Sequence, residues 1–67
     1  MKNVLKSKRK ERGLTQSEIA DELGITRSFY GHIETGKRNP TLILSFKIAD
    51  FFDDNVENIF LKNENGS

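Results

Sequence analysis

The sequence predicts a single all-α domain, for three reasons. Its 67 residues suffice for one domain and no more. Apolar residues recur at helical spacing between capping residues and glycines. No segment alternates apolar and polar residues as a half-buried strand would. Because the chain has no cysteine and one histidine, disulfides and histidine-rich metal sites cannot stabilise it, and apolar packing must do so.

Two glycines and one capping box define the first two expected helices. The first should span residues 4–12, because Gly13 after it is a suitable C-cap. Thr15 and Glu18 have the spacing of a capping box, in which each side chain bonds the other residue's backbone amide. The helix that this box opens should end at Gly24.

N-cap residues mark the remaining three helices. A Thr or Asn side chain can accept a hydrogen bond from an amide in the first turn of a helix. Such residues precede three segments: Thr26 precedes 27–34, Thr41 precedes 42–52, and Asn55 precedes 56–61. We therefore expect one five-helix domain over residues 1–61, followed by a polar, frayed tail at 62–67.

Charge is unevenly distributed, although the net charge is only +1. The local balance is +5 over residues 1–12, −3 over 13–23, +2 over 24–40 and −3 over the remainder. A basic front and an acidic back are typical of a domain that meets phosphates on one side. A solvated N-terminal helix would have the same charge, so charge alone leaves both interpretations open.

Residues 16–34 carry the most specific pattern in the chain. Two short helices joined by a tight turn form a helix-turn-helix. Gly24 suits the turn because glycine adopts positive φ without a steric penalty. Ile25 should fill the angle between the helices, and the small Ala20 lets them cross closely. The joint spacing, rather than any one residue, makes the pattern specific.

These motifs resemble the lambda-repressor-like, or XRE-type, helix-turn-helix family, and the likeness extends over about residues 5–60. The matching segments are 14–16 (LTQ), 18–20 (EIA), 23–27 (LGITR), 33–34 (IE), 36–40 (GKRNP), 47–49 (KIA) and 57–60 (ENIF). The resemblance implies a five-helix DNA-binding domain, usually dimeric, that regulates transcription by occupying operators.

The resemblance also implies that residues 27–34 form the recognition helix, with its N-terminal end in the major groove. The outward side chains expected to contact base edges are Arg27, Ser28, Phe29 and His32. Arg27 suits the O6 and N7 atoms of guanine. Phe29 could instead cover the core, and each of the others could be an ordinary solvated residue.

Phosphate contacts are expected on both sides of the recognition helix. Gln16 resembles the family residue that contacts a phosphate and braces that helix, at a helix N-terminus that favours anions. The full set of expected phosphate contacts is Gln16, Thr26, Lys37 and Arg38. Arg9 and Glu34 occupy the family positions that form a structural ion pair between the first and third helices.

Two places depart from the family pattern. Gly31 stands where a larger polar residue is usual, and a mid-helix glycine costs about 1 kcal/mol. Close approach by DNA or by a neighbouring side chain would explain it, as would a helix that is simply weak. Asp53 and Asp54 replace a glycine and an apolar residue, so that turn should be built differently. With Asp50 they are not expected to bind metal, because no EF-hand pattern is present.

The fourth expected helix is apolar on nearly all sides. One stripe comprises Leu42, Phe46, Ala49 and Phe52, and further apolar surface comes from Ile43, Leu44, Ile48 and Phe51. A helix of this kind is buried on more than one side. A second copy of the chain is the favoured cover, although a crowded monomer core is the alternative. The expected dimer interface comprises Ile43, Phe51, Val56 and Phe60.

These observations lead to one hypothesis: a homodimeric, sequence-specific regulator of transcription, in the form of a repressor, bound to double-stranded DNA at a near-palindromic operator. The alternative is a protein-interaction module, such as an antitoxin that neutralises a partner protein. We do not expect an enzyme, since there is no cysteine nucleophile and the histidine lies on the expected DNA face.

No small-molecule ligand is expected, because no effector domain follows residue 61, and neither a cofactor nor a metal is expected. The longest apolar run, residues 42–44, is far too short to cross a membrane, and no signal-peptide core follows the basic start. A cytoplasmic location is therefore expected.

Overall fold

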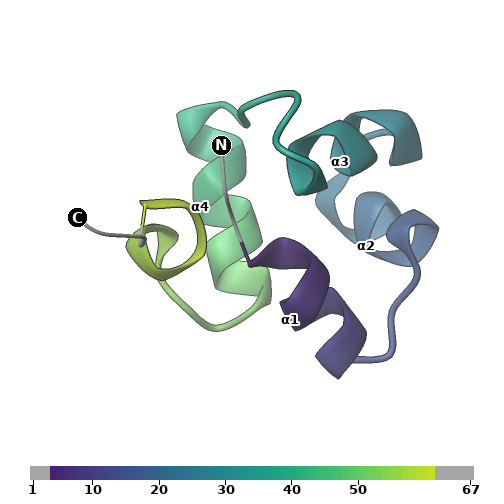
Figure 1. Ribbon diagram of the computed structural model, residues 1–67, viewed down its shortest axis with the longest axis horizontal. Helices are drawn as coiled ribbons and strands as arrows, with labels where there is room; N and C mark the ends of the chain where they lie inside the picture. Colours follow the sequence, from purple (N-terminus) through teal and green to yellow (C-terminus); the bar gives the residue numbers. More distant parts are fainter. Residues whose placement is uncertain (1–3, 62–67) are drawn as a thin grey trace.

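The computed structural model describes residues 4–61, which are helical and contain no strand (Figure 1). The helices are α1 (Leu5–Glu11), α2 (Gln16–Leu23), α3 (Arg27–Glu34), α4 (Leu42–Phe51) and the π-helical turn η1 (Glu57–Leu61). The all-α prediction is confirmed, and the expected helix boundaries agree to within one residue or so. The tail expected at 62–67 lies outside the described residues.

Side-chain caps start the helices where the sequence places them. Thr15 Oγ1 accepts from the Glu18 amide (3.1 Å), and the Thr15 amide donates to Glu18 Oε1 (2.8 Å), which completes the capping box. Thr26 caps α3 and Thr41 caps α4, each by accepting from an amide three residues on (both 3.1 Å). These local bonds satisfy amides that would otherwise lack an intrahelical partner.

All five elements contribute to one apolar core. The largest fully buried side chains belong to Leu5, Ile19, Tyr30, Ile33, Ile48 and Ile59, and they come from every element. Ile25, in the turn between α2 and α3, is partly buried against them. The core therefore fixes α2 and α3 relative to the other helices, and these two lie at one end of the molecule with η1 at the other (Figure 1).

The structure shows which face of α4 meets the core, a point that the sequence left open. Leu44, Ile48 and Ala49 face the core, whereas Leu42 and Phe46 are 69% and 59% exposed. Because both faces of this helix are apolar, helical periodicity could not identify the face that meets the core. The face that is left exposed on α4 carries Leu42, Ile43 and Phe46.

Aspartates build the turn between α4 and η1. Asp53 has φ +55°, a left-handed conformation that Asp tolerates better than most side chains. Asp54 accepts from the amide of Asn55 (2.8 Å) and forms an ion pair with Lys8 of α1 (2.7 Å). Asn55 in turn accepts from the amide of Asn58 (2.9 Å), as a cap should. The turn thus replaces a glycine's conformational freedom with side-chain hydrogen bonds.

Candidate nucleic-acid interface

Gly24 and Lys47 fix the turn between the two helices of the helix-turn-helix. Gly24 ends α2 with φ +74°, a conformation that favours glycine. Lys47 of α4 donates to the Leu23 carbonyl (3.1 Å), which lies at the C-terminal end of α2, where a cation is favourable. The turn and α4 therefore hold α2 and α3 at a fixed angle.

An ion pair joins α1 to the end of α3. Arg9 Nε donates to Glu34 Oε2 (2.8 Å) and Arg9 Nη2 donates to Glu34 Oε1 (3.1 Å). The two side chains are 11% and 3% exposed. Arg9 also donates to the Leu14 carbonyl (2.8 Å), and Tyr30 donates to Glu34 Oε2 (2.7 Å). A carboxylate this deeply buried requires such partners.

The cluster changes the acidity of its members. Burial raises the pKa of the Glu34 carboxyl, but hydrogen bonds from Arg9, Tyr30 and Gln16 outweigh burial, so the net pKa is lowered. Burial, and then the hydrogen bond to Glu34, raise the pKa of the Tyr30 hydroxyl well above its usual value. The hydrogen bond to Glu34 raises the pKa of Arg9, although burial opposes it. Glu34 is therefore ionised at neutral pH.

Gln16 links this buried cluster to the surface of α3. Its Nε2 donates to Glu34 Oε1 (3.0 Å), and its Oε1 accepts from Arg27 Nη1 (3.0 Å). Because Glu34 can only accept here, it orients the Gln16 amide with the oxygen toward Arg27. The exposed guanidinium of Arg27 is thereby held in one place, and its other N–H groups remain available to a ligand.

A shallow hollow of about 280 Å³ lies where α2 and α3 meet. Its lining consists of Gln16, Arg27, Ser28, Gly31, His32, Thr35 and Lys37. Of these described residues, none carries a carboxylate, and two carry a positive charge. The hollow thus gathers three of the expected base-contact residues with two of the expected phosphate-contact residues.

A family model described as helix-turn-helix matches residues 5–53, which include α1 to α4. The chain belongs to the XRE-type helix-turn-helix family. This is a DNA-binding, non-enzymatic class of proteins. The match includes α2 and α3, which line the hollow, and Arg9 of α1, which pairs with Glu34.

Relatives of similar length match most of this chain. An uncharacterised HTH-type transcriptional regulator of Methanocaldococcus jannaschii is 48% identical over 61 residues, which cover 91% of this chain and 92% of the relative. A second, from Methanothermobacter thermautotrophicus, is 38% identical and covers 100% of this chain and 99% of the relative. A third, from Bacillus subtilis, is 36% identical and covers 97% and 100%.

Three expected contact residues of this helix-turn-helix protein lie outside the hollow. Phe29 is partly buried and packs against the core, in agreement with the alternative role considered for it. Thr26 is exposed at the start of α3, and Arg38 is exposed in the loop that follows it. Conversely, Thr35 lines the hollow and was not singled out from the sequence. Its position, four residues after Gly31, was the signal that could have identified it.

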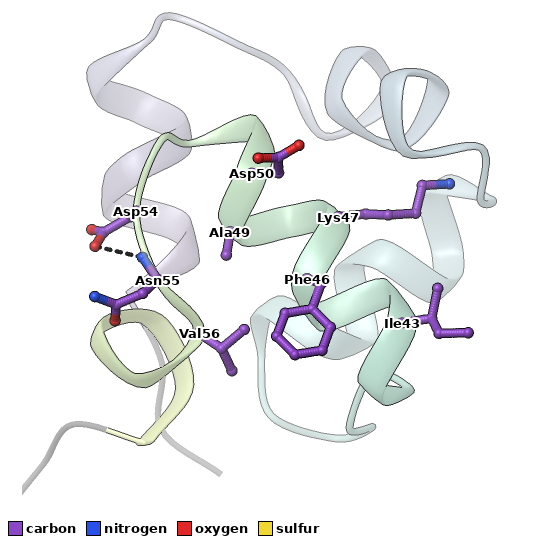
Figure 2. A pocket seen from close by; sticks show the side chains of 8 residues that line it. All are labelled: Ile43, Phe46, Lys47, Ala49, Asp50, Asp54, Asn55 and Val56. Atoms are coloured by element: carbon purple, nitrogen blue, oxygen red, sulfur yellow. Dashed lines mark hydrogen bonds between the residues drawn. The ribbon is translucent and has the colours of Figure 1, made fainter.

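A second, more apolar groove of about 480 Å³ lies between α4 and residues 54–56, as Figure 2 shows. Ile43 and Val56, two of the expected dimer residues, line it together with Phe46. The other two expected dimer residues, Phe51 and Phe60, do not line this groove.

The side chains of Phe60 and Phe51 both make contacts within the chain. Phe60 is 3% exposed, so its assignment to a dimer surface is corrected here: the side chain is part of the core. Phe51 is half-buried, and the Arg12 guanidinium lies 5.8 Å from the centre of its ring. Sequence spacing could not reveal these contacts, because Arg12 reaches Phe51 from another helix.

No described helix has both the length and the apolar character needed to cross a membrane. Among residues 4–61, no three or more His, Cys, Asp or Glu side chains gather where a metal ion could bind.

Proposed function

We propose that the protein is a sequence-specific transcriptional regulator that places α3 in the major groove of double-stranded DNA. The observation that carries this proposal is the connection from Arg27 through Gln16 to Glu34, because it orients a guanidinium before any ligand is bound. A pre-oriented arginine loses less conformational freedom on forming the two hydrogen bonds to guanine O6 and N7. Ser28 and His32 lie beside it and supply further base contacts.

Phosphate contacts position the domain on the duplex in this proposal. Lys37 and Arg38 follow α3 and are exposed, while Thr26 and Gln16 lie at the starts of α3 and α2. Amides at a helix start favour an anion, and the two cations add attraction that does not depend on sequence. Binding should therefore weaken steeply as salt is raised, through release of counterions.

The regulator acts as a homodimer in this proposal, joined through the exposed face of α4. Ile43 and Phe46 are 75% and 59% exposed beside the groove of Figure 2, a pattern typical of an interface. The groove runs along α4, and Lys47, one of its lining residues, reaches the C-terminal end of α2. Two copies joined there would present their α3 helices to half-sites about 34–36 Å apart on a near-palindromic operator. Repression would follow where such an operator overlaps a promoter.

Selection from a library of randomised duplexes tests the proposal. The wild-type protein is expected to enrich a near-palindromic sequence with half-sites about one helical turn apart. The Arg27→Ala variant should enrich the same spacing but lose preference at one base pair in each half-site. An output that stays random after repeated rounds would contradict sequence-specific binding.

The same experiment bears on the alternative of a protein-interaction module. A partner protein docked on the apolar face of α4 would be held mainly by burial of Ile43 and Phe46, and such binding depends little on salt. Random selection output combined with a monomeric protein would favour this alternative over the homodimeric regulator.

A further inference from the structure

Gly31, at the middle of α3, is one of the residues that line the polar hollow. The other lining residues come from α2, from α3 and from the residues that follow α3, and position 31 adds no side chain to the hollow. A mid-helix glycine weakens a helix relative to alanine. We therefore ask which contact around position 31 could offset this cost.

Neither the backbone nor the packing of the described structure requires glycine at position 31. The residue lies within α3, and the three glycines with positive φ are Gly13, Gly24 and Gly36. A Cβ placed on Gly31 would lie 3.7 Å from Gln16 Oε1 and 3.9 Å from Gln16 Nε2, which is ordinary van der Waals contact. An alanine would therefore fit, so no contact within the described chain accounts for the glycine.

The lining of the hollow indicates what approaches Gly31. Arg27 and Lys37 carry positive charge, and Ser28 and His32 can each donate a hydrogen bond. Such a lining suits a group that presents hydrogen-bond acceptors. In DNA this chemistry belongs to the O6 and N7 edge of guanine and to phosphate oxygens.

The position of the hollow favours the base edge over the phosphate. Gly31 lies four residues after Arg27, on the same face of α3, and next to His32. The residues expected to meet phosphates, Gln16 and Lys37, come from outside α3, and the Gln16 amide lies next to Gly31. With α3 placed in the major groove as proposed, Gly31 lies one turn after Arg27 on the face that meets base edges.

We infer that the bare backbone at Gly31 admits the acceptor edge of a guanine into the hollow, which makes Gly31 a specificity-determining position. This inference rests on the proposed function. The Arg27 guanidinium, held by Gln16, donates to this edge from one side of the hollow. A side chain at position 31 would occupy the space of the base and lift α3 away from it.

The test compares Gly31→Ala with the wild type in stability and in binding to DNA. The probes are the duplex that the wild type selects and a scrambled duplex of the same composition. The variant should melt a few degrees higher, about 4 °C, because alanine strengthens the helix. Its affinity for the selected duplex should fall about tenfold, as expected for the loss of one base contact, while its affinity for the scrambled duplex should stay the same.

The opposite signs of these two effects exclude misfolding as the cause. Ser7→Ala, at an exposed position of α1, is the control and should leave both affinities at the wild-type values. Equal loss on both duplexes would overturn the base-edge assignment in favour of a phosphate in the hollow. Unchanged affinity for the selected duplex would overturn the inference altogether. If the wild type selects no duplex, the proposed function fails and the inference falls with it.

Discussion

Arg9 and Glu34, 25 positions apart in sequence, form a two-pronged ion pair in which Arg9 Nε lies 2.8 Å from Glu34 Oε2. The pair joins the basic first helix, α1, to the C-terminal end of α3. Glu34 also accepts hydrogen bonds from Gln16 and Tyr30. One buried carboxylate therefore connects α1, α2 and α3. The arrangement of α1, α2 and α3 around the hollow therefore depends on this buried charge.

Removal of Arg9 should destabilise the fold more than removal of a neighbouring lysine. Arg9→Ala leaves the Glu34 carboxylate buried without its cation, which typically costs about 3 kcal/mol or more. In a domain of this size we expect the melting temperature to fall by about 10 °C or more. Lys10→Ala, at an exposed position of the same helix, is the control and should change it by about 2 °C at most. Equal shifts in thermal denaturation would contradict the structural role of the pair.

Acid should destabilise the protein through its carboxylates. The pKa of Glu34 lies below its ordinary value of 4.5, and hydrogen bonds from Lys8, Asn58 and the Asn55 amide hold that of Asp54 well below 3.8. A carboxyl group with a lowered pKa in the folded state contributes stability above its unfolded pKa, and this is lost as pH falls toward the folded value. We expect a constant melting temperature from about pH 7 to about pH 5 and a steady fall below roughly pH 4.5.

The Asp54→Asn variant distinguishes the contribution of Asp54 to this pH dependence from that of Glu34. The variant should melt lower than the wild type at pH 7, because it loses the ion pair with Lys8. The difference between the two proteins should shrink as the wild-type carboxylate is protonated in acid. A melting temperature that differs by the same amount at pH 7 and at roughly pH 2.5 would be incompatible with a lowered pKa at Asp54.

Local signals account for most of what could be predicted from the sequence. Thr15, Thr26 and Thr41 cap helices through bonds that span three residues, and such short-range chemistry is visible in a linear pattern. The helix-turn-helix followed from Gly24 in the same way. The contact surface of α4 could not be predicted, because Phe46 and Ile48 are both apolar and only the tertiary fold decides which is buried.

The hollow was equally inaccessible to pattern analysis. The sequence showed that Gly31 is unusual for its position. It could not show what surrounds Gly31, which is the Gln16 side-chain amide from α2. The orientation of that amide depends in turn on the buried Glu34 carboxylate. Side-chain geometry of this kind arises from contacts between helices, which the spacing of residues along the chain does not contain.

Substitution of Gln16 should weaken DNA recognition more than stability. Gln16→Met keeps the length of the side chain and removes its hydrogen bonds to Arg27 and Glu34, while Glu34 retains Arg9 and Tyr30. We expect affinity for the selected duplex to fall about tenfold, because Arg27 is no longer oriented. The melting temperature should fall by a few degrees, about 5 °C at most.

The neighbouring exposed residue offers a matched control for Gln16. Ser17→Ala lies in the same first turn of α2 and should keep wild-type affinity for the selected duplex. A Gln16→Met variant that binds as tightly as the wild type would show that orientation of Arg27 is unimportant for binding.

A charge on the exposed face of α4 should dissociate the proposed homodimer. Phe46 is 59% exposed within one chain, so Phe46→Glu should fold while placing a charge where two apolar surfaces would meet. Sedimentation equilibrium should give twice the chain mass for the wild type and a single chain mass for the variant. A wild type that remains monomeric at high micromolar concentration would refute the homodimer.

The central claim is that α3 reads DNA sequence through Arg27, and a fluorescence-anisotropy titration against the duplex upstream of the protein's own gene tests it most directly. At low and at moderate salt, wild-type binding should survive an excess of scrambled duplex. Arg27→Ala should weaken binding to this duplex alone, by about tenfold, whereas Arg38→Ala should weaken binding to both duplexes equally. If scrambled duplex displaces the wild type as readily as its own sequence does, or if Arg27→Ala and Arg38→Ala behave alike, the claim is contradicted.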